Sequence, residues 1–357
     1  MNIFQAIKNP YEAPNPYIYT LMDGINKQFK DINWSWGYEL WTPQIYNVDI
    51  IHIHWPTWLL KPNEKETKSL NELDFKLKEL KKNNVKIIAT CHNLEPHYCN
   101  DTFQRELYDV VYRNCNLILH LGEYSLCQLK QKLPYINHKL LPHHIYDEIY
   151  VHFPKREECI KKLNLSKKAL YILCFGAFRN IEENKLVLDI AQHFKKRNIY
   201  ILAPSYEELP TPKNIIEKIR NEFYKLYLKY KYHIIITGKT TNTVSNDLVP
   251  FYYGASNICL IHRKKILNSG NITMAMMMGK IIVGPNIGNV GDILTKINNP
   301  TFNINNNETI YESIDKAINL SLTSNLGSIN KSISFENLST HRISAQLYNI
   351  YKEILNQ

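Results

Sequence analysis

The sequence predicts an α/β protein with two domains, each containing a doubly wound parallel sheet covered by helices. One reason is a repeated order in which a short apolar run is followed by a loop and then by a segment with helical spacing. A second reason is that the apolar runs are almost unbroken, as in residues 48–54, which is typical of parallel strands buried on both faces. The length agrees, because 357 residues are enough for two domains of ordinary size.

The first domain is expected over residues 1–155 and opens with a strand at residues 2–7. A segment rich in proline and tyrosine follows, and then a helix that ends near Phe29. Further alternation predicts strands at residues 48–54, 85–91 and 116–121, and helices at residues 70–80, 102–113 and 123–132. Leu140 and Leu141 belong to the expected last strand, and the polar residues 153–168 predict a linker with a short helix.

The second domain is expected over residues 169–335. Its pattern predicts strands at residues 169–175, 199–203, 232–237, 257–261 and 280–283, and helices at residues 187–194, 214–230, 248–255, 268–278 and 308–320, with a short helix from Val290. Residues 321–334, rich in serine and asparagine, predict an irregular segment that serves as a second hinge. A terminal helix at residues 340–357 has one apolar face, formed by Ile343, Leu347, Ile350 and Ile354.

Composition and charge restrict the location and the partners. Seven cysteines occur without CxxC pairs or metal-like spacing, which favours free thiols in a reducing compartment, so we expect a cytoplasmic protein. No apolar run approaches the roughly 20 residues that span a bilayer, so an integral membrane protein is not expected. The net charge of +10 indicates anionic partners: nucleic acid, nucleotide phosphates or an anionic membrane surface.

Residues 262–294 carry the strongest functional signal. The strand and helix expected here are joined by a loop that ends on a helix N-terminus, where backbone N–H groups lack internal partners and the helix dipole is positive. Ser269 can cap this helix, Gly270 permits close approach to the backbone, and Arg263 adds positive charge together with Lys264 and Lys265. These features predict a phosphate site.

An ordinary strand–helix–strand crossover turned by Ser269 and Gly270 explains this dipeptide about equally well. The second half of the stretch favours a ligand site, because another loop with several glycines precedes the helix that starts near Val290. Its glycines and proline are Gly284, Pro285, Gly288 and Gly291. Two such loops at the carboxyl ends of neighbouring strands are typical of a ligand crevice.

This stretch resembles the donor-site segment of GT-B fold glycosyltransferases of the group 1, family 4-like type. It is closest to a branch with a Ser-Gly-Asn loop, similar to bacterial enzymes that assemble surface polysaccharides. The resemblance implies two Rossmann-like domains facing across a cleft, an N-terminal one for the acceptor and a C-terminal one for the nucleotide-sugar donor. It also implies that the terminal helix crosses back to the first domain. One departure is Met274, which stands where many relatives have a glutamate for the ribose.

The resemblance also implies donor-binding residues. Relatives hold the donor diphosphate with an arginine at the position of Arg179 and often with a lysine at the position of Glu182, so Lys185 or Arg263 is a candidate for the second charge. A surface salt bridge is the alternative role for an arginine at a strand end. The expected donor-binding residues are Arg179, Gly238, Lys239, Arg263, Asn268, Ser269, Gly270 and Asn271.

Residues 92–97 resemble the Val-His-Asn-x-x-Pro-His segment of β-1,4-mannosyltransferases that act on lipid-linked sugars. The candidate catalytic residues here are His92, Glu95 and His97. An imidazole can donate to a sugar hydroxyl or accept the acceptor's proton, because its pKa lies near neutrality. A structural role is the alternative for a lone histidine at a strand end, but the neighbouring Glu95 and His97 favour catalysis for His92.

Together these observations predict a hexosyltransferase that moves a sugar from a nucleotide sugar to a glycan or lipid-linked glycan, in surface polysaccharide or glycoconjugate assembly. No Asp-x-Asp occurs, so we expect transfer without a metal or another cofactor. The alternatives are a nucleotide-sugar epimerase or phosphorylase on the same fold, a catalytically inactive homologue, and a basic nucleic-acid-binding protein. The last is disfavoured and nucleic acid is not an expected partner, because no helix-turn-helix, RNP or zinc motif occurs.

The expected helix at residues 214–230 has two interpretations. Ile216, Ile219, Phe223, Leu226 and Tyr230 keep helical spacing, and lysines flank them. Such a helix can lie on a membrane, and peripheral contact with the anionic inner face of the cytoplasmic membrane is compatible with the charge. The favoured expectation is that this stripe packs against the sheet and that the lysines face solvent.

Overall fold

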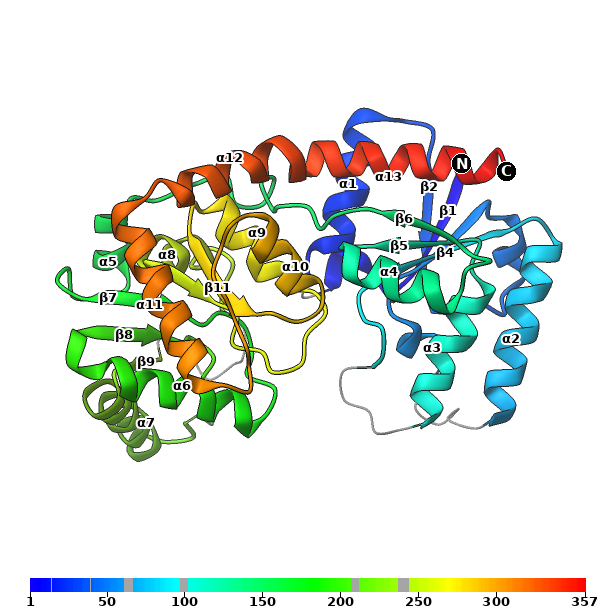
Figure 1. Ribbon diagram of the computed structural model, residues 1–357. Coiled ribbons are helices and arrows are strands. Elements are labelled where there is room, and N and C mark those ends of the chain that lie inside the picture. The colour runs from blue at the N-terminus through cyan, green and yellow to red at the C-terminus, as the bar shows by residue number, and fades with distance from the viewer. Residues whose placement is uncertain (14, 39, 61–66, 97–101, 207–211, 237–243) are drawn as a thin grey trace. The chain divides into compact units, whose positions relative to one another are not determined.

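The computed structural model describes the chain except for residues 14, 39, 61–66, 97–101, 207–211 and 237–243 (Figure 1). The chain divides into two compact units. Residues 1–144 and 337–357 form the first unit, and residues 145–336 form the second. The boundary after His144 precedes the expected domain end at Lys155. The expected linker helix, α5 (Arg156–Lys162), therefore belongs to the second unit, where it packs on α8 (Val249–Ala255).

The described part of the first unit contains a parallel sheet in the order β2-β1-β3-β4-β5-β6. Its strands are β1 (Asn2–Ala6), β2 (Asn33–Trp36), β3 (Ile50–Ile53), β4 (Lys86–Cys91), β5 (Leu117–His120) and β6 (Asn137–Leu140). Its longer helices are α1 (Tyr17–Gln28), α2 (Thr67–Lys82), α3 (Thr102–Asn114), α4 (Glu123–Lys132) and α13 (Thr340–Leu355). Three short 3₁₀ turns each begin with proline: η1 (Pro10–Glu12), η2 (Pro43–Asn47) and η3 (Pro56–Trp58).

The interior strands confirm the unbroken apolar pattern, because every residue of β3 and β5 is buried. The edge strand β2 is not among the predicted elements. It is largely exposed, and its sequence Asn-Trp-Ser-Trp lacks an apolar run. Pairing with β1 forms this strand, with Asn33 opposite Asn2 and Trp36 opposite Gln5.

The terminal helix α13 returns to the first unit and lies along α1 (Figure 1). A Cβ atom added at Gly24 would lie 2.8 Å from Oγ of Ser344, so the two helix backbones approach closely here. The ring of Tyr348 stacks on Phe29 at 3.7 Å between centroids. The prediction that the last helix docks on the first domain is confirmed, and the four residues named for its apolar face are all buried.

The described part of the second unit contains a parallel sheet in the order β12-β11-β10-β7-β8-β9. Its strands are β7 (Leu170–Leu173), β8 (Ile199–Leu202), β9 (Ile234–Ile235), β10 (Ile258–Leu260), β11 (Ile281–Pro285) and β12 (Thr301–Phe302). Besides α5 and α8, its helices are α6 (Ile181–Phe194), α7 (Ile215–Tyr227), α9 (Gly270–Met277), α10 (Gly288–Lys296) and α11 (Asn307–Thr323), with short turns η5 (Lys195–Arg197) and η6 (Leu228–Tyr232).

The prediction of an irregular segment at residues 321–334 is wrong, because α12 (Leu326–Leu338) covers most of it. Asn330 is fully buried, and its amide donates to the carbonyl of Lys280 at 2.9 Å. Ser334 is also buried, and its hydroxyl donates to the carbonyl of Lys331. Serine and asparagine have low helix propensity, but these hydrogen bonds satisfy their side chains inside the fold.

The favoured expectation for α7 is also wrong. Its apolar stripe does not pack against the sheet, because Ile216, Ile219, Phe223 and Leu226 are all exposed. Separately, among the residues that the structure describes, no helix combines the length and the apolar character needed to cross a membrane.

Candidate active site

The loop after β7 delivers Arg179 to the start of α6. Gly176 has a φ of +93°, a backbone conformation that favours glycine. Asn180 caps α6, because its side chain accepts from the backbone N–H of Glu183 at 3.0 Å. Arg179, half-buried, therefore lies at the junction of a strand end and a helix N-terminus, as the sequence predicts.

Glu183 joins the two arginines of this region. Its carboxylate is buried, and Oε2 accepts from the backbone N–H of Arg179 at 2.8 Å and from the guanidinium Nη1 of Arg263. The side chain of Arg263 is only 11% exposed, so the ion pair lies almost entirely out of water. Glu183 is absent from the sequence-based site. Its signal is the spacing Asn180-x-x-Glu183, which is that of a capping box.

The first loop, Arg263 and the start of α9 converge at Gly176. A Cβ atom at Gly176 would lie 3.6 Å from Nη2 of Arg263 and 3.7 Å from Nδ2 of Asn271. Two of the expected donor-binding residues, Arg263 and Asn271, are therefore brought together across the ends of β7 and β10, which are neighbouring strands. The positive end of α9 adds to the charge of the guanidinium.

The asparagines at the start of α9 hold the loop in place. The side chain of Asn271 donates to the carbonyl of Phe175 at 2.8 Å and accepts from the hydroxyl of Tyr253 at 3.3 Å. The side chain of Asn268 accepts from the amide of Asn289 at 2.7 Å. These bonds tie the loop to β7, to α8 and to α10, so the backbone at the helix start is rigidly placed.

Two expectations need correction, one about the start of α9 and one about the glycines and the proline after it. Ser269 occupies the N-cap position, but its side chain makes no capping hydrogen bond, so it does not cap α9. Gly284 and Pro285 lie in β11 rather than in an open loop. Gly288 serves close packing, because a Cβ atom there would lie 2.7 Å from the carbonyl oxygen of Ile266. Met274 is buried in α9, at the position where the relatives have glutamate.

Glu182, at the position where the resemblance implies that relatives often have a lysine, forms a surface ion pair. The carboxylate of Glu182 lies 3.4 Å from Nζ of Lys264, and the Glu182 side chain is 65% exposed. Such an exposed pair contributes little to stability. Lys264, which belongs to the expected phosphate loop, therefore lies at the surface next to the buried pair of Glu183 and Arg263.

His262 is a further candidate that the sequence does not single out. Its ring stacks on Phe178 at 4.2 Å between centroids, and it is 1% exposed. Neither ring nitrogen has a hydrogen-bond partner within the described structure. Burial lowers the pKa of His262 to about 3, and the positive charges of Arg263 and Arg179 act in the same direction. The imidazole is therefore neutral.

His92 lies in a cluster of aromatic rings at the carboxyl end of β4 in the first unit. Its ring stacks on Trp55 at 4.6 Å and meets the edge of Tyr17 at 5.1 Å between centroids. Its Nε2 lies 3.2 Å from Nδ1 of His54, within hydrogen-bonding distance. The hydroxyl of Tyr17 is buried without a hydrogen-bond partner in the described structure.

A chain of buried polar groups, linked by hydrogen bonds, connects this cluster to α13. Nε2 of His54 lies 3.1 Å from Oε1 of Gln5, and the amide of Gln5 reaches the hydroxyl of Tyr351 on α13. The same hydroxyl lies 2.7 Å from Nδ1 of His52. Burial lowers the pKa of His52 to about 3 and that of His54 well below its usual value. The chain therefore orients the His92 ring through neutral groups.

Of the remaining predicted residues, the structure describes Glu95 and does not place it in either cluster. Glu95 is exposed in the loop that follows β4. His97, Gly238 and Lys239 lie outside the described residues. In the parts of both units that are described, no set of three or more His, Cys, Asp or Glu side chains is placed to hold a metal ion.

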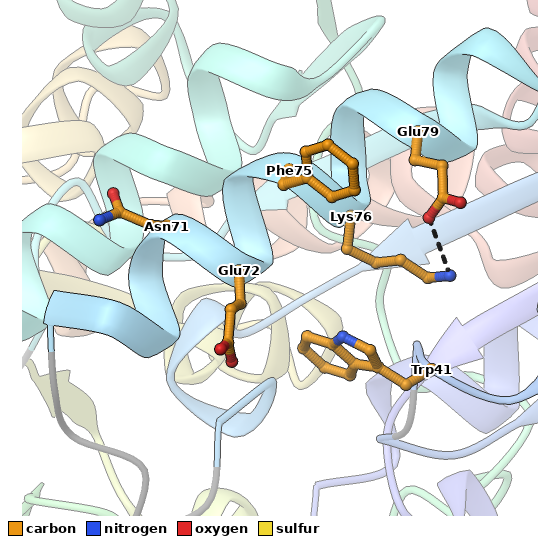
Figure 2. A pocket seen from close by; sticks show the side chains of 6 residues that line it. All are labelled: Trp41, Asn71, Glu72, Phe75, Lys76 and Glu79. Atoms are coloured by element: carbon orange, nitrogen blue, oxygen red, sulfur yellow. Dashed lines mark hydrogen bonds and ion pairs between the residues drawn. The ribbon is translucent and has the colours of Figure 1, made fainter.

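A shallow pocket on the outer face of α2 is a different kind of surface (Figure 2). Its lining residues are Trp41, Asn71, Glu72, Phe75, Lys76 and Glu79. Lys76 is committed to Glu79, at 3.2 Å, and to the hydroxyl of Tyr46. The cation of this pocket is therefore paired with a carboxylate of the same lining.

The comparisons with known proteins concern the whole chain. A sucrose-phosphate synthase from Thermosynechococcus elongatus superposes with a TM-score of 0.74 at 11% identity, over 99% of both chains. HepE of Anabaena, in complex with UDP, gives a TM-score of 0.66 at 12% identity, over 99% of both chains. The chain has the GT-B fold.

A third GT-B neighbour is a glycosyltransferase from Rickettsia africae, with a TM-score of 0.64 at 16% identity over 99% of this chain and 98% of that one. No protein-family model matches the sequence, and no curated protein matches it either. The GT-B fold, which the sequence predicts from the loops after β7 and β10, is therefore confirmed by structural comparison. The three neighbours share only 11% to 16% of their residues with this chain.

Proposed function

We propose that the protein is a glycosyltransferase that moves a sugar from a nucleotide-sugar donor to a glycan acceptor. The observation that carries the proposal is the convergence of Arg263, held by buried Glu183, with the loop of Arg179 and the N-terminus of α9. This group offers the guanidinium of Arg179, a second guanidinium whose charge is shared with Glu183, and helix-terminal amides, which suit a diphosphate. HepE, which shares the fold, was captured with UDP.

In this proposal the second unit stabilises the leaving group. The bond between the anomeric carbon and the diphosphate oxygen breaks, and negative charge develops on that oxygen. Arg179, Arg263 and the first N–H groups of α9 supply donors for this charge, so transfer needs no metal ion.

The first unit acts on the acceptor. We place His92 in contact with the transferring sugar or with the acceptor hydroxyl, which forms the new bond to the anomeric carbon and loses its proton. His54 holds the His92 ring in one orientation, and Trp55 offers an aromatic face beside it. The finer proposal is hexosyl transfer to a lipid-linked glycan in surface polysaccharide or glycoconjugate assembly in the cytoplasm.

Replacing Arg179 with Ala should weaken binding of the nucleoside diphosphate by about 1.5 to 3 kcal/mol, because a charged hydrogen-bond donor is lost. The measurement is calorimetric titration with the nucleotide that most raises the melting temperature in a panel of UDP, GDP, CMP and their sugars. Arg197→Ala is the matched control, because Arg197 pairs with Asp315 on the surface of the same unit. Equal affinity of the Arg179 variant and the control would remove Arg179 from the site.

Replacing His92 with Ala should lower turnover at least about tenfold while donor affinity changes much less, because acid–base or transition-state contacts are lost. The measurement is sugar transfer to a verified acceptor, with donor affinity measured separately. His152→Ala is the control, because His152 is exposed. Normal turnover of the His92 variant would assign this histidine to packing against Trp55 and Tyr17.

Product analysis separates the proposed reaction from its alternative on the same fold. A transferase releases nucleoside diphosphate in proportion to glycosylated acceptor. An epimerase converts the nucleotide sugar to its epimer without any acceptor. Nucleotide-sugar binding with neither product would instead indicate an inactive homologue. Met274 motivates this alternative, because many relatives have a glutamate for the ribose at its position.

A further inference from the structure

The helix α7 (Ile215–Tyr227) exposes a continuous apolar face. Ile216 is 73% exposed, Phe223 is 68% exposed, and Tyr230 in the following turn is 68% exposed. Ile215, Ile219, Leu226 and Tyr227 are exposed as well. At 100° per residue the apolar residues of α7 occupy an arc of about 120°, which is a single face of the helix. The described residues of the second unit therefore leave this face uncovered.

The opposite side of α7 holds the helix to the second unit. Asn221 is buried, and Leu228, which follows the helix, is buried in the core of this unit. Tyr224 packs against the same core. The N-terminus is capped, because the side chain of Asn214 accepts from the N–H of Glu217 at 2.9 Å. The helix is thus docked through the side that carries Asn221 and Tyr224, and the opposite, apolar face is exposed.

Basic side chains flank the apolar arc on both sides. The segment from Lys213 to Tyr232 contains six basic and two acidic residues. Arg220 lies just beyond one edge of the arc. Glu222 and then Lys218 lie beyond the other edge, and both basic residues are exposed. One of the two acidic residues, Glu222, is paired with Lys225 at 2.9 Å. The charge around the arc is therefore strongly positive.

We propose that α7 is a membrane-docking helix that lies in the interface of an anionic bilayer, with its apolar arc among the acyl chains and its basic borders at the phosphate level. A second copy of the chain is a poorer occupant, because it would bring two basic borders together. The docking itself does not depend on glycosyl transfer. Its consequence, delivery of the enzyme to a lipid-linked acceptor, rests on the proposed function.

The test is co-sedimentation of the full chain with vesicles of phosphatidylcholine alone or with about one-third phosphatidylglycerol, an anionic lipid. We expect binding to the anionic vesicles and little to the neutral ones. The double variant Ile216→Ser with Phe223→Ser and the double variant Lys218→Glu with Arg220→Glu should each lower the partition coefficient at least about tenfold. Matched controls are Phe75→Ser, an exposed aromatic on α2, and Lys130→Glu on α4.

Nucleotide-induced thermal shift is measured on the same samples. Unchanged shifts in the α7 variants show that they are folded and separate membrane docking from donor binding. The proposal is overturned if the unaltered chain does not bind anionic vesicles, or if the α7 variants bind as well as the controls. It is equally overturned if Phe223→Ser abolishes a dimer seen by sedimentation velocity while vesicle binding is absent, since α7 would then join two copies.

Discussion

Replacing Arg263 with Ala is expected to lower the free energy of unfolding of the second unit by about 3 to 5 kcal/mol, because it leaves the carboxylate of Glu183 buried without its partner. The Glu183 side chain is 2% exposed, so water cannot replace the guanidinium. The measurement is urea denaturation followed by far-ultraviolet circular dichroism. Tryptophan fluorescence serves as an internal reference, since all five tryptophans lie in the first unit.

Two variants make this prediction specific. Adding Glu183→Gln to Arg263→Ala should restore most of the lost stability, because the amide carries no charge and still accepts from the N–H of Arg179. Arg197→Ala should cost less than about 1 kcal/mol, because the pair of Arg197 with Asp315 is exposed. A cost for Arg263→Ala as small as that of this control would contradict the role of the buried pair.

Acidification is expected to unfold the first unit well before ordinary acid denaturation of surface carboxylates. His52, His54 and His120 are buried, and burial lowers the pKa of His52 and of His120 to about 3. In the unfolded chain each imidazole has a pKa near 6.5, so between these values the unfolded state binds more protons. Stability is therefore fully present above about pH 6.5 and is lost as the pH falls toward 3.

Each pKa unit corresponds to about 1.4 kcal/mol, so several such histidines together exceed the stability of a typical domain. We expect tryptophan fluorescence to report unfolding with a midpoint at about pH 5. One of these tryptophans is Trp55, which stacks on His92. His120→Asn, which removes one titrating group, should make the pH dependence less steep. His341→Asn, at an exposed site of the first unit, should leave it unchanged. A free energy of unfolding that is constant from pH 7 to pH 5 would contradict this prediction.

The proposed donor site was only partly predictable from the sequence. Arg179 and Gly270 could be proposed because each follows an apolar strand, and strand ends in a parallel sheet meet at one edge. Glu183 could not, because its role depends on Arg263, which is 80 residues away. The capping-box spacing marks Glu183 as a helix-start residue, but pairing with a second strand end is a tertiary event. His262 has no local signal, since only packing against Phe178 isolates its nitrogens.

Three elements of the fold show where local patterns mislead. The strand β2 lacks an apolar run and forms through pairing with β1. The helix α12 is built from serine and asparagine side chains whose hydrogen bonds lie inside the second unit. The helix α7 has the apolar stripe of a packed helix, but the structure docks it through the other side. In each case the tertiary environment of the residues determined the structure. Intrinsic helix or strand propensity does not include this environment.

The sequence by itself determined the α/β class, the succession of most strands and helices, and the loops that follow β7 and β10. These follow from periodicity and from glycine, proline and capping residues, which act over a few residues. Only the tertiary structure decided which side chains meet: Glu183 with Arg263, His52 with Tyr351 across 299 residues, and the apolar face of α7 with no partner in the described chain. The physical reason is that hydrogen bonds, ion pairs and burial depend on the distance between groups in space, and chain folding sets that distance.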